Sequence, residues 1–136
     1  MESKNLNLTP LLNAKAAFEE VLASEADLVG QFYKIYRAAT IQHFEFCFEL
    51  ATKFMKRWLE QNHTESLDKM FTVKDIYRLG AMHDLLQSAE RWFVYRDMRN
   101  KTSHTYNETT AEQVFQETAD FYTDFCYLID RLSERL

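Results

Sequence analysis

Glycine and proline are scarce in this sequence, which argues against folds that are rich in tight turns. The chain of 136 residues contains only 2 Gly and 1 Pro, whereas average usage would give roughly ten Gly and seven Pro. β-Sandwiches and α/β folds with many loops need such residues at their turns. The composition therefore favours a helical fold.

Several further features are also missing. No run of about 18 uncharged apolar residues is present, so no membrane span is predicted. The first eight residues lack the basic-then-apolar layout of a signal peptide. The two cysteines, Cys47 and Cys126, lie in apolar stretches and fit the buried thiols of a cytoplasmic protein better than a disulfide framework. The net charge of -5 excludes a generally basic nucleic-acid-binding protein, although it does not exclude a local basic patch.

The hydrophobic content is sufficient for one substantial core. Hydrophobic residues make up 46% of the chain and aromatic residues 15%, so we expect a core rich in aromatic rings. A chain of this length is the size of one domain, and we assign residues 1–136 to a single domain.

The spacing of apolar residues predicts five helices. The first is expected to follow an N-cap at Thr9, with Pro10 in the first helical position, and the second to run from about Gln31 to Gln61. A polar connector over Asn62–Phe71 leads to a short third helix from Thr72 to Met82. The fourth is expected from a Ser88 cap to about Thr102, and the fifth from a capping box of Thr109 and Glu112 to the C-terminus. No stretch alternates as a strand would. The predicted fold class is all-α: an antiparallel up-down bundle of about five helices with a four-helix core.

Two of these helices carry distinctive surfaces. The second is apolar on more than one side, from Phe32 and Ile35 onward, so other helices or a partner subunit must cover it. The last has one clean apolar stripe and an acidic outer face that is expected to include Glu112 and Asp124.

A positive segment interrupts this acidic chain. Between Arg91 and Tyr106 there are four cations and one anion, a balance of +3, so the rest of the chain carries -5 minus +3, or -8. Such a segment is either a solvated helix face paired with acids elsewhere or an anion site, for which phosphate is the natural ligand of arginine.

His104 favours the anion site. It lies near the predicted end of the fourth helix, four residues after Asn100 and directly after Ser103. A histidine beside arginine, amide and hydroxyl groups at a helix terminus is well placed to transfer protons.

These residues form a motif with a family resemblance. Arg99-x4-His104-x-Tyr106, with Asn100 after the arginine, is similar to the motif of HEPN-domain proteins. The stretch Ile41-Gln42-x-Phe44-Glu45-Phe46-x-Phe48-Glu49-Leu50-Ala51-x-Lys53 resembles the second helix of one branch, the nucleotidyltransferase substrate-binding proteins. Two positions depart from that branch, which often has Trp at Thr52 and Gly near His83, and neither touches the motif.

The resemblance implies a dimer whose two motifs face each other. Many members of the family are toxins that cut RNA without a metal, and their antitoxin is a minimal (MNT-type) nucleotidyltransferase. In the branch with this motif, the partner can attach AMP to the motif tyrosine, which is Tyr106 here, and thereby silence the toxin. The branch name reflects another idea, that the chain presents substrate to the nucleotidyltransferase.

The chemistry of these residues fits RNA cleavage by attack of a 2′-OH on the adjacent phosphorus. That reaction needs a base, an acid and positive charge at the phosphorane. A two-fold dimer supplies two copies of His104 and two of Arg99, so we expect a composite site in a homodimer. The scheme needs no metal and no cofactor. His43 and Cys47 are spaced as a ligand pair, but no third or fourth ligand is near them in sequence.

Two features have alternative interpretations. Glu45 and Glu49 are expected to pair with arginines of the fourth helix, such as Arg96 or Arg99, or with Arg78, and the alternative is a catalytic role. Tyr106 either stacks on the end of the bundle or receives a nucleotidyl group.

Three functions therefore remain open: a ribonuclease toxin, a non-catalytic subunit that binds substrate or nucleotide for a partner nucleotidyltransferase, and a dimeric scaffold. The intact motif makes the scaffold the weakest of the three, and the other two use the same residues.

Overall fold

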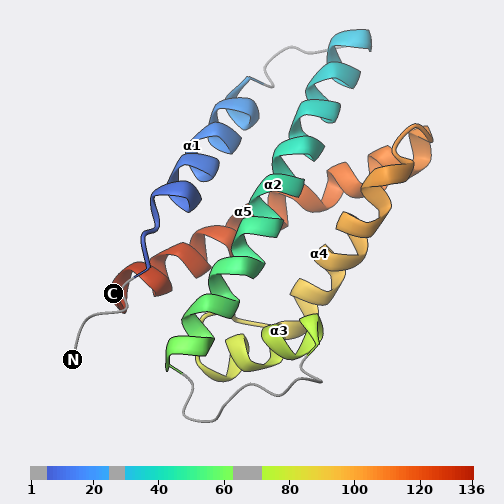
Figure 1. The fold of residues 1–136 in the computed structure, drawn as a ribbon. Coiled ribbons are helices and arrows are strands. Elements are labelled where there is room, and N and C mark those ends of the chain that lie inside the picture. Colours follow the sequence, from blue (N-terminus) through green and yellow to red (C-terminus); the bar gives the residue numbers. More distant parts are fainter. Residues whose placement is uncertain (1–5, 25–29, 63–71) are drawn as a thin grey trace.

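The computed structural model describes residues 6–24, 30–62 and 72–136, and its five α-helices confirm the predicted all-α bundle (Figure 1). The helices are α1 (Thr9–Ala23), α2 (Gly30–Asn62), α3 (Val73–Met82), α4 (Ala89–Lys101) and α5 (Glu108–Glu134), with a short 3-10 turn, η1 (Thr102–His104), after α4. Most of the predicted connector over Asn62–Phe71 lies outside the described residues. None of the described helices is long and apolar enough to cross a membrane.

Local signals placed two helix starts correctly. Thr72 and Asp75 form a reciprocal capping box at α3, in which the Thr72 hydroxyl accepts from the Asp75 N–H at 3.2 Å and the Asp75 carboxylate accepts from the Thr72 N–H at 2.9 Å. Ser88 caps α4 by accepting from the Arg91 N–H at 3.3 Å. Both caps confirm the prediction.

Two other predicted caps are wrong. Thr9 is already the first residue of α1, and its N–H donates to the Asn7 side chain at 3.0 Å. Helix α5 begins one residue before Thr109, because Asn107 caps it by accepting from the Thr110 N–H at 3.1 Å. An asparagine is as good a cap as a threonine, so the upstream residue starts the helix.

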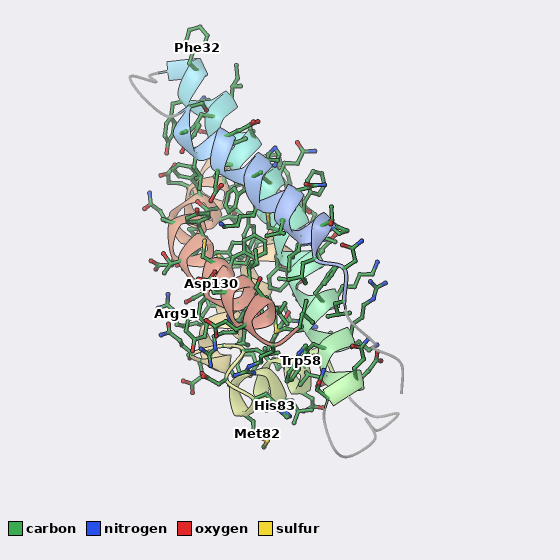
Figure 2. All side chains as sticks on the ribbon, turned by 90° about the vertical axis from the view of Figure 1, so that its left-hand side faces the viewer. Phe32, Trp58, Met82, His83, Arg91 and Asp130 are labelled. Atoms are coloured by element: carbon green, nitrogen blue, oxygen red, sulfur yellow. The ribbon has the colours of Figure 1, made fainter. Side chains whose placement is uncertain are left out.

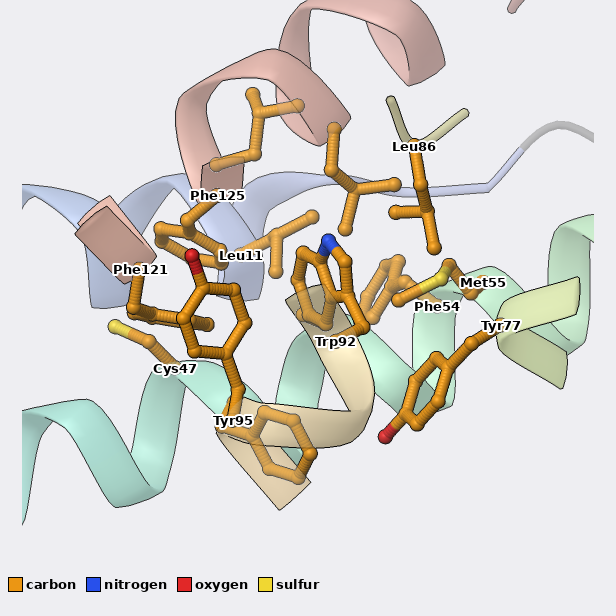
Figure 3. Packing of buried hydrophobic residues seen from close by; sticks show 14 of the residues in the cluster. Leu11, Cys47, Phe54, Met55, Tyr77, Leu86, Trp92, Tyr95, Phe121 and Phe125 are labelled. Atoms are coloured by element: carbon orange, nitrogen blue, oxygen red, sulfur yellow. The ribbon is translucent and has the colours of Figure 1, made fainter. Parts of the chain in front are cut away.

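The core is built around aromatic rings, as predicted. Trp92 of α4 is 1% exposed and lies at the centre of the cluster, with Phe121 and Phe125 of α5 on one side and Phe54 and Met55 of α2 on the other (Figure 3). The Trp92 and Phe121 rings are 5.6 Å apart and meet edge to face, which is a favoured geometry for such pairs.

Helix α2 packs against all four other helices, which explains why it is apolar on more than one side. Its first turns are the exception, because Phe32 is 59% exposed and Ile35 is 64% exposed. Figure 2 shows Phe32 projecting from the end of α2, away from the rest of the bundle. The described helices do not bury these two side chains, so their coverage by a partner subunit, the other alternative, stays a prediction.

One acid of α5 lies inside the bundle. Asp124 is 5% exposed, accepts from the Arg91 Nε–H at 2.7 Å, and also accepts from the Tyr95 hydroxyl. The prediction that Asp124 lies on the outer face of α5 is wrong, because its side of the helix faces α4. Both cysteines are free thiols; Cys47 is buried and Cys126 is half-buried.

A candidate arginine–histidine site between α2, α4 and α5

Arg99, near the end of α4, reaches across to two glutamates of α2. Its Nε donates to Glu49 Oε2 at 2.7 Å, and its Nη2 donates to the same oxygen. Its Nη1 lies 3.4 Å from Glu45 Oε2. The predicted pairing of these glutamates with an α4 arginine is confirmed, and the pairs fix the direction of the guanidinium group.

The other two candidate arginines do not bind these glutamates. Arg78 pairs within its own helix, with Asp75 at 3.1 Å. Arg96 has no carboxylate within ion-pair distance in the part of the chain that the structure describes. It is therefore a half-buried cation whose charge no acid of that part neutralises.

Thr102 completes the network around Arg99. Its hydroxyl lies 2.9 Å from Glu45 Oε2 and 2.7 Å from the Arg99 carbonyl, and it accepts from Arg99 Nη1 at 3.4 Å. Thr102 is not among the site residues predicted from the sequence. A threonine three residues after an arginine at a helix end is the signal that could have found it, because its hydroxyl can bond back to the i−3 carbonyl.

Arg99 retains capacity for an anion. A guanidinium group has five N–H donors, and the hydrogen bonds to Glu49 and Thr102 use three of them. The Arg99 side chain is 32% exposed. Two donors, one on each Nη, can therefore turn to a phosphate oxygen that approaches from solvent, the one on Nη1 in place of its ion pair with Glu45.

His104 is exposed, as predicted, and ends the 3-10 turn that follows α4. The α-helix stops at Lys101, so Asn100 and His104 do not share one α-helical face. Among the described residues, the His104 ring lies edge to face with Tyr106, at 6.1 Å between centroids, and makes no hydrogen bond or ion pair. Tyr106 is 83% exposed, and Asn100 and Ser103 are also exposed. The structure thus presents the whole motif after Arg99 to solvent.

A buried arginine anchors the segment behind the motif. Arg37 of α2 is 7% exposed and donates to Glu108 and to Glu112, each at 3.0 Å. The Tyr33 hydroxyl donates to Glu112 at 2.8 Å. These bonds hold the first turns of α5 against α2, directly after the loop that carries His104.

These bonds also change the pKa values of the two glutamates. The hydrogen bond from Arg37 lowers the pKa of Glu108, and the hydrogen bond from Tyr33 lowers the pKa of Glu112, because both bonds favour the ionised carboxylate. This cluster could not be predicted from the sequence, since Arg37 is more than 70 residues from both glutamates.

Two cavities adjoin the Arg99 network. One, of about 350 Å³, lies between α2, η1 and α5, and Glu45, Thr102 and Thr105 line part of it. The other is a groove of about 290 Å³ between α2, α3 and α4, lined by Phe48, Glu49, Thr52, Val73, Tyr77, Arg96, Arg99 and Asn100. The site is therefore open on both sides of the Arg99–glutamate pairs.

The residue pair considered for a metal does not form a site in the described chain. Cys47 is fully buried, and burial raises the pKa of its thiol to about 12. His43 lies edge to face with Phe46. Among the residues that the structure describes, no group of three or more His, Cys, Asp or Glu side chains is placed to hold a metal ion.

The fold and the site together define a class: a small helical bundle with an exposed Arg-x4-His-x-Tyr motif held by glutamates of its longest helix. Residues 6–134 match the family described as "Nucleotidyltransferase substrate binding protein like". The chain belongs to this family, which confirms its resemblance to that branch of the HEPN-domain proteins.

Similar proteins carry two kinds of description. A curated protein of Haemophilus influenzae, "Probable ribonuclease HepT", is 39% identical over 99 residues, which are 72% of this chain and 68% of that protein. A solved structure from Haemophilus influenzae is described as the fold of a substrate binding domain of a nucleotidyltransferase. It has a TM-score of 0.86 and 32% identity, and the match covers 93% of this chain and 99% of that one.

A second solved structure, a crystal structure from Thermus thermophilus, has a TM-score of 0.74 and 27% identity, with 90% of this chain and 98% of that chain covered. The two solved structures thus share the fold over at least 90% of this chain.

Proposed function

We propose that this chain is the toxin of a toxin–antitoxin pair and acts as a metal-independent endoribonuclease. The observation that carries the proposal is that Arg99 is held in a fixed direction five residues before an exposed His104. The name of the Haemophilus influenzae relative, a probable ribonuclease, supports the same activity. The two free cysteines are in keeping with a cytoplasmic setting.

In the proposed reaction the ribose 2′-OH of RNA attacks the adjacent phosphorus, and the P–O5′ bond breaks to leave a cyclic phosphate. One imidazole removes the proton of the 2′-OH, and a second gives a proton to the departing 5′-oxygen. The free donors of Arg99 stabilise the charge on the phosphorane. The chain supplies each of these groups, so the scheme requires no metal or cofactor.

One chain has one His104, so the reaction needs a homodimer that brings two motifs to one cleft. Exposed apolar side chains support self-association: Ile35 and Phe46, which is 49% exposed, are about three helical turns apart on one face of α2. Exposed apolar surface of this kind is typical of interfaces.

The proposal assigns Tyr106 as the site of control by a partner, a minimal (MNT-type) nucleotidyltransferase. The phenolic oxygen would attack the α-phosphorus of ATP, bind AMP and release pyrophosphate. With 83% of the residue exposed, Tyr106 is open to a second enzyme. AMP at this position would place a bulky anion beside His104 and repel the RNA phosphates. Intact mass measurement after co-expression with the partner tests this step.

The supporting residues have positioning roles in this scheme. Glu45 and Glu49 orient Arg99, while Asn100 and Ser103 are exposed beside it and can contact RNA. Arg96 adds positive charge on the same helix. None of these side chains is required to transfer a proton.

The test is digestion of total RNA by the purified chain in the presence of EDTA. The wild-type chain is expected to cut and His104→Ala to be inactive. His83→Ala is the matched control, because this histidine lies beside Trp58 at the α3 end of the bundle (Figure 2). Cleavage by His104→Ala at the wild-type rate would refute the catalytic role.

A second function uses the same residues without cleavage. The Haemophilus influenzae structure is described as a substrate binding domain of a nucleotidyltransferase, and the Arg99 site of this chain has donors free for a phosphate group. In that case the chain would hold a nucleotide for the partner enzyme. Binding of RNA or nucleotide, measured separately, together with no cut product in the digestion assay would favour this alternative.

A further inference from the structure

Arg96 is one of the cations that line the groove between α2, α3 and α4. It is half-buried, and in the described ranges no carboxylate lies within ion-pair distance of it. Among the described residues, the groove is lined by two arginines, Arg96 and Arg99, and by one acid, Glu49. Glu45, outside this lining, also pairs with Arg99 at 3.4 Å, and neither glutamate pairs with Arg96. Glu49 is bound to Arg99, which leaves the charge of Arg96 available to a ligand.

The larger cavity is different in this respect. Its cations are Arg37 and Lys34, and both are paired with carboxylates: Arg37 with Glu108 and Glu112, and Lys34 with Glu108 at 3.8 Å. An anion would have to displace these acids. Of the two cavities, the groove at Arg96 is therefore the better anion site.

The remaining walls of the groove suit a nucleotide rather than a simple anion. Val73, which is 37% exposed, offers an apolar wall, and Tyr77 and Phe48 close the floor beneath it. Tyr77 is fully buried and its hydroxyl is bonded to Thr52 at 2.8 Å. The exposed amide of Asn100 can donate to and accept from a base edge.

We propose that this groove binds one nucleotide of single-stranded RNA that flanks the cleaved bond. Arg96 binds its phosphate, the base lies against Val73, and Asn100 contacts the base edge. The identity of the ligand as RNA rests on the proposed function. The groove shares Arg99 and Asn100 with the motif that also contains His104.

The volume agrees with this assignment. Small-molecule sites occupy roughly 300–1,000 Å³, and a groove of about 290 Å³ is at the lower limit of that range. A single nucleotide unit of a longer strand is therefore a better fit than a larger cofactor.

The experiment measures binding of a fluorescein-labelled 2′-O-methyl RNA oligonucleotide of mixed sequence, which cannot undergo 2′-OH attack. Anisotropy is measured with the full chain at several salt concentrations. Arg96→Gln is expected to weaken binding about tenfold and to lower the slope of log K against log salt by roughly 0.7, as for loss of one single-strand phosphate contact.

A second variant and a matched control make the result specific to the groove. Val73→Glu places an acid in the first turn of α3, where the helix dipole tolerates it, and should also weaken binding. Arg57→Gln removes the same charge from α2 outside the groove, where Arg57 lies over the Phe54 ring; it should stay within about twofold of wild type. Thermal melts check that each variant is folded.

The outcomes separate this inference from the proposed function. Equal binding by the Arg96→Gln and Arg57→Gln chains, or no binding by the wild type, overturns the groove assignment even if RNA is cut. Weaker binding in Arg96→Gln, with no cleavage of natural RNA by the wild type, supports the groove and refutes the ribonuclease. Weaker binding in Arg96→Gln together with cleavage by the wild type supports both.

Discussion

Replacing His104 by Ala should separate stability from activity. The residue is exposed, and within the described chain its ring lies edge to face with Tyr106 and makes no hydrogen bond or ion pair. Substitutions at such positions change the free energy of unfolding by at most about 0.5 kcal/mol. For a domain of this size that corresponds to a shift in Tm of less than about 4 °C. The structure therefore predicts a folded, inactive protein.

Subunit mixing shows whether one active site needs two imidazoles. In a heterodimer of one wild-type and one His104→Ala chain, a composite site has either its acid or its base but not both. General acid or base catalysis contributes about 10²–10⁴-fold, so a purified heterodimer should retain at most about 1% of wild-type activity. Two independent sites would instead retain about half of it.

The assay uses chains with two different affinity tags, co-expressed and purified over both tags in sequence. Initial rates of RNA cleavage are compared with those of the doubly tagged wild-type dimer, in EDTA. A heterodimer with half the wild-type rate would refute the composite site while leaving His104 catalytic. A wild-type rate would refute any role of His104 in the rate-limiting chemistry.

The other predictions concern the residues that hold the site in place. Glu49→Gln should destabilise the fold by less than about 1 kcal/mol, because the Glu49 side chain is 54% exposed. The same substitution should lower kcat more than it raises KM, since Arg99 loses its orientation. An unchanged kcat would argue against this positioning role. Arg37→Met should lower the free energy of unfolding, measured in urea, by about 2 kcal/mol. The substitution removes the charge-assisted bonds of a buried guanidinium group, while its partners Glu108 and Glu112 are exposed enough to be solvated by water instead. A loss below about 0.5 kcal/mol would contradict the anchoring role of Arg37. Because the folded-state pKa of Glu112 is lowered, mainly by the Tyr33 hydrogen bond, its stabilisation is complete above the ordinary value of 4.5 and is lost as the pH falls through the folded value. Thermal melts of Glu112→Gln and wild type should therefore differ at pH 7 and converge toward pH 3, and a constant difference would refute this linkage.

Much of the fold is predictable from the sequence because its signals are local. The scarcity of glycine and proline, the helical spacing of apolar residues, and the caps at Thr72 and Ser88 each depend on residues within a few turns of one another. The misplaced start of α5 also has a local cause. Asn107 started α5 ahead of the expected Thr109, since either side chain can cap a helix.

The candidate site was likewise predictable only where its residues are close together in the sequence. Arg99 through Tyr106 could be identified because the motif lies in one short segment, and pairing of Glu45 and Glu49 with an α4 arginine could be expected from charge. Which arginine they bind was decided by the tertiary structure.

What the sequence by itself determined is the all-helical bundle and the exposed motif at the end of α4. Only the tertiary structure decided that Arg37 anchors Glu108, that Asp124 is buried against Arg91 and Tyr95, and that Arg96 remains unneutralised within the described residues. The physical reason is that such pairs join residues dozens of positions apart. Their partners depend on how two helices cross and in which register, and helical periodicity within one segment carries no information about that crossing.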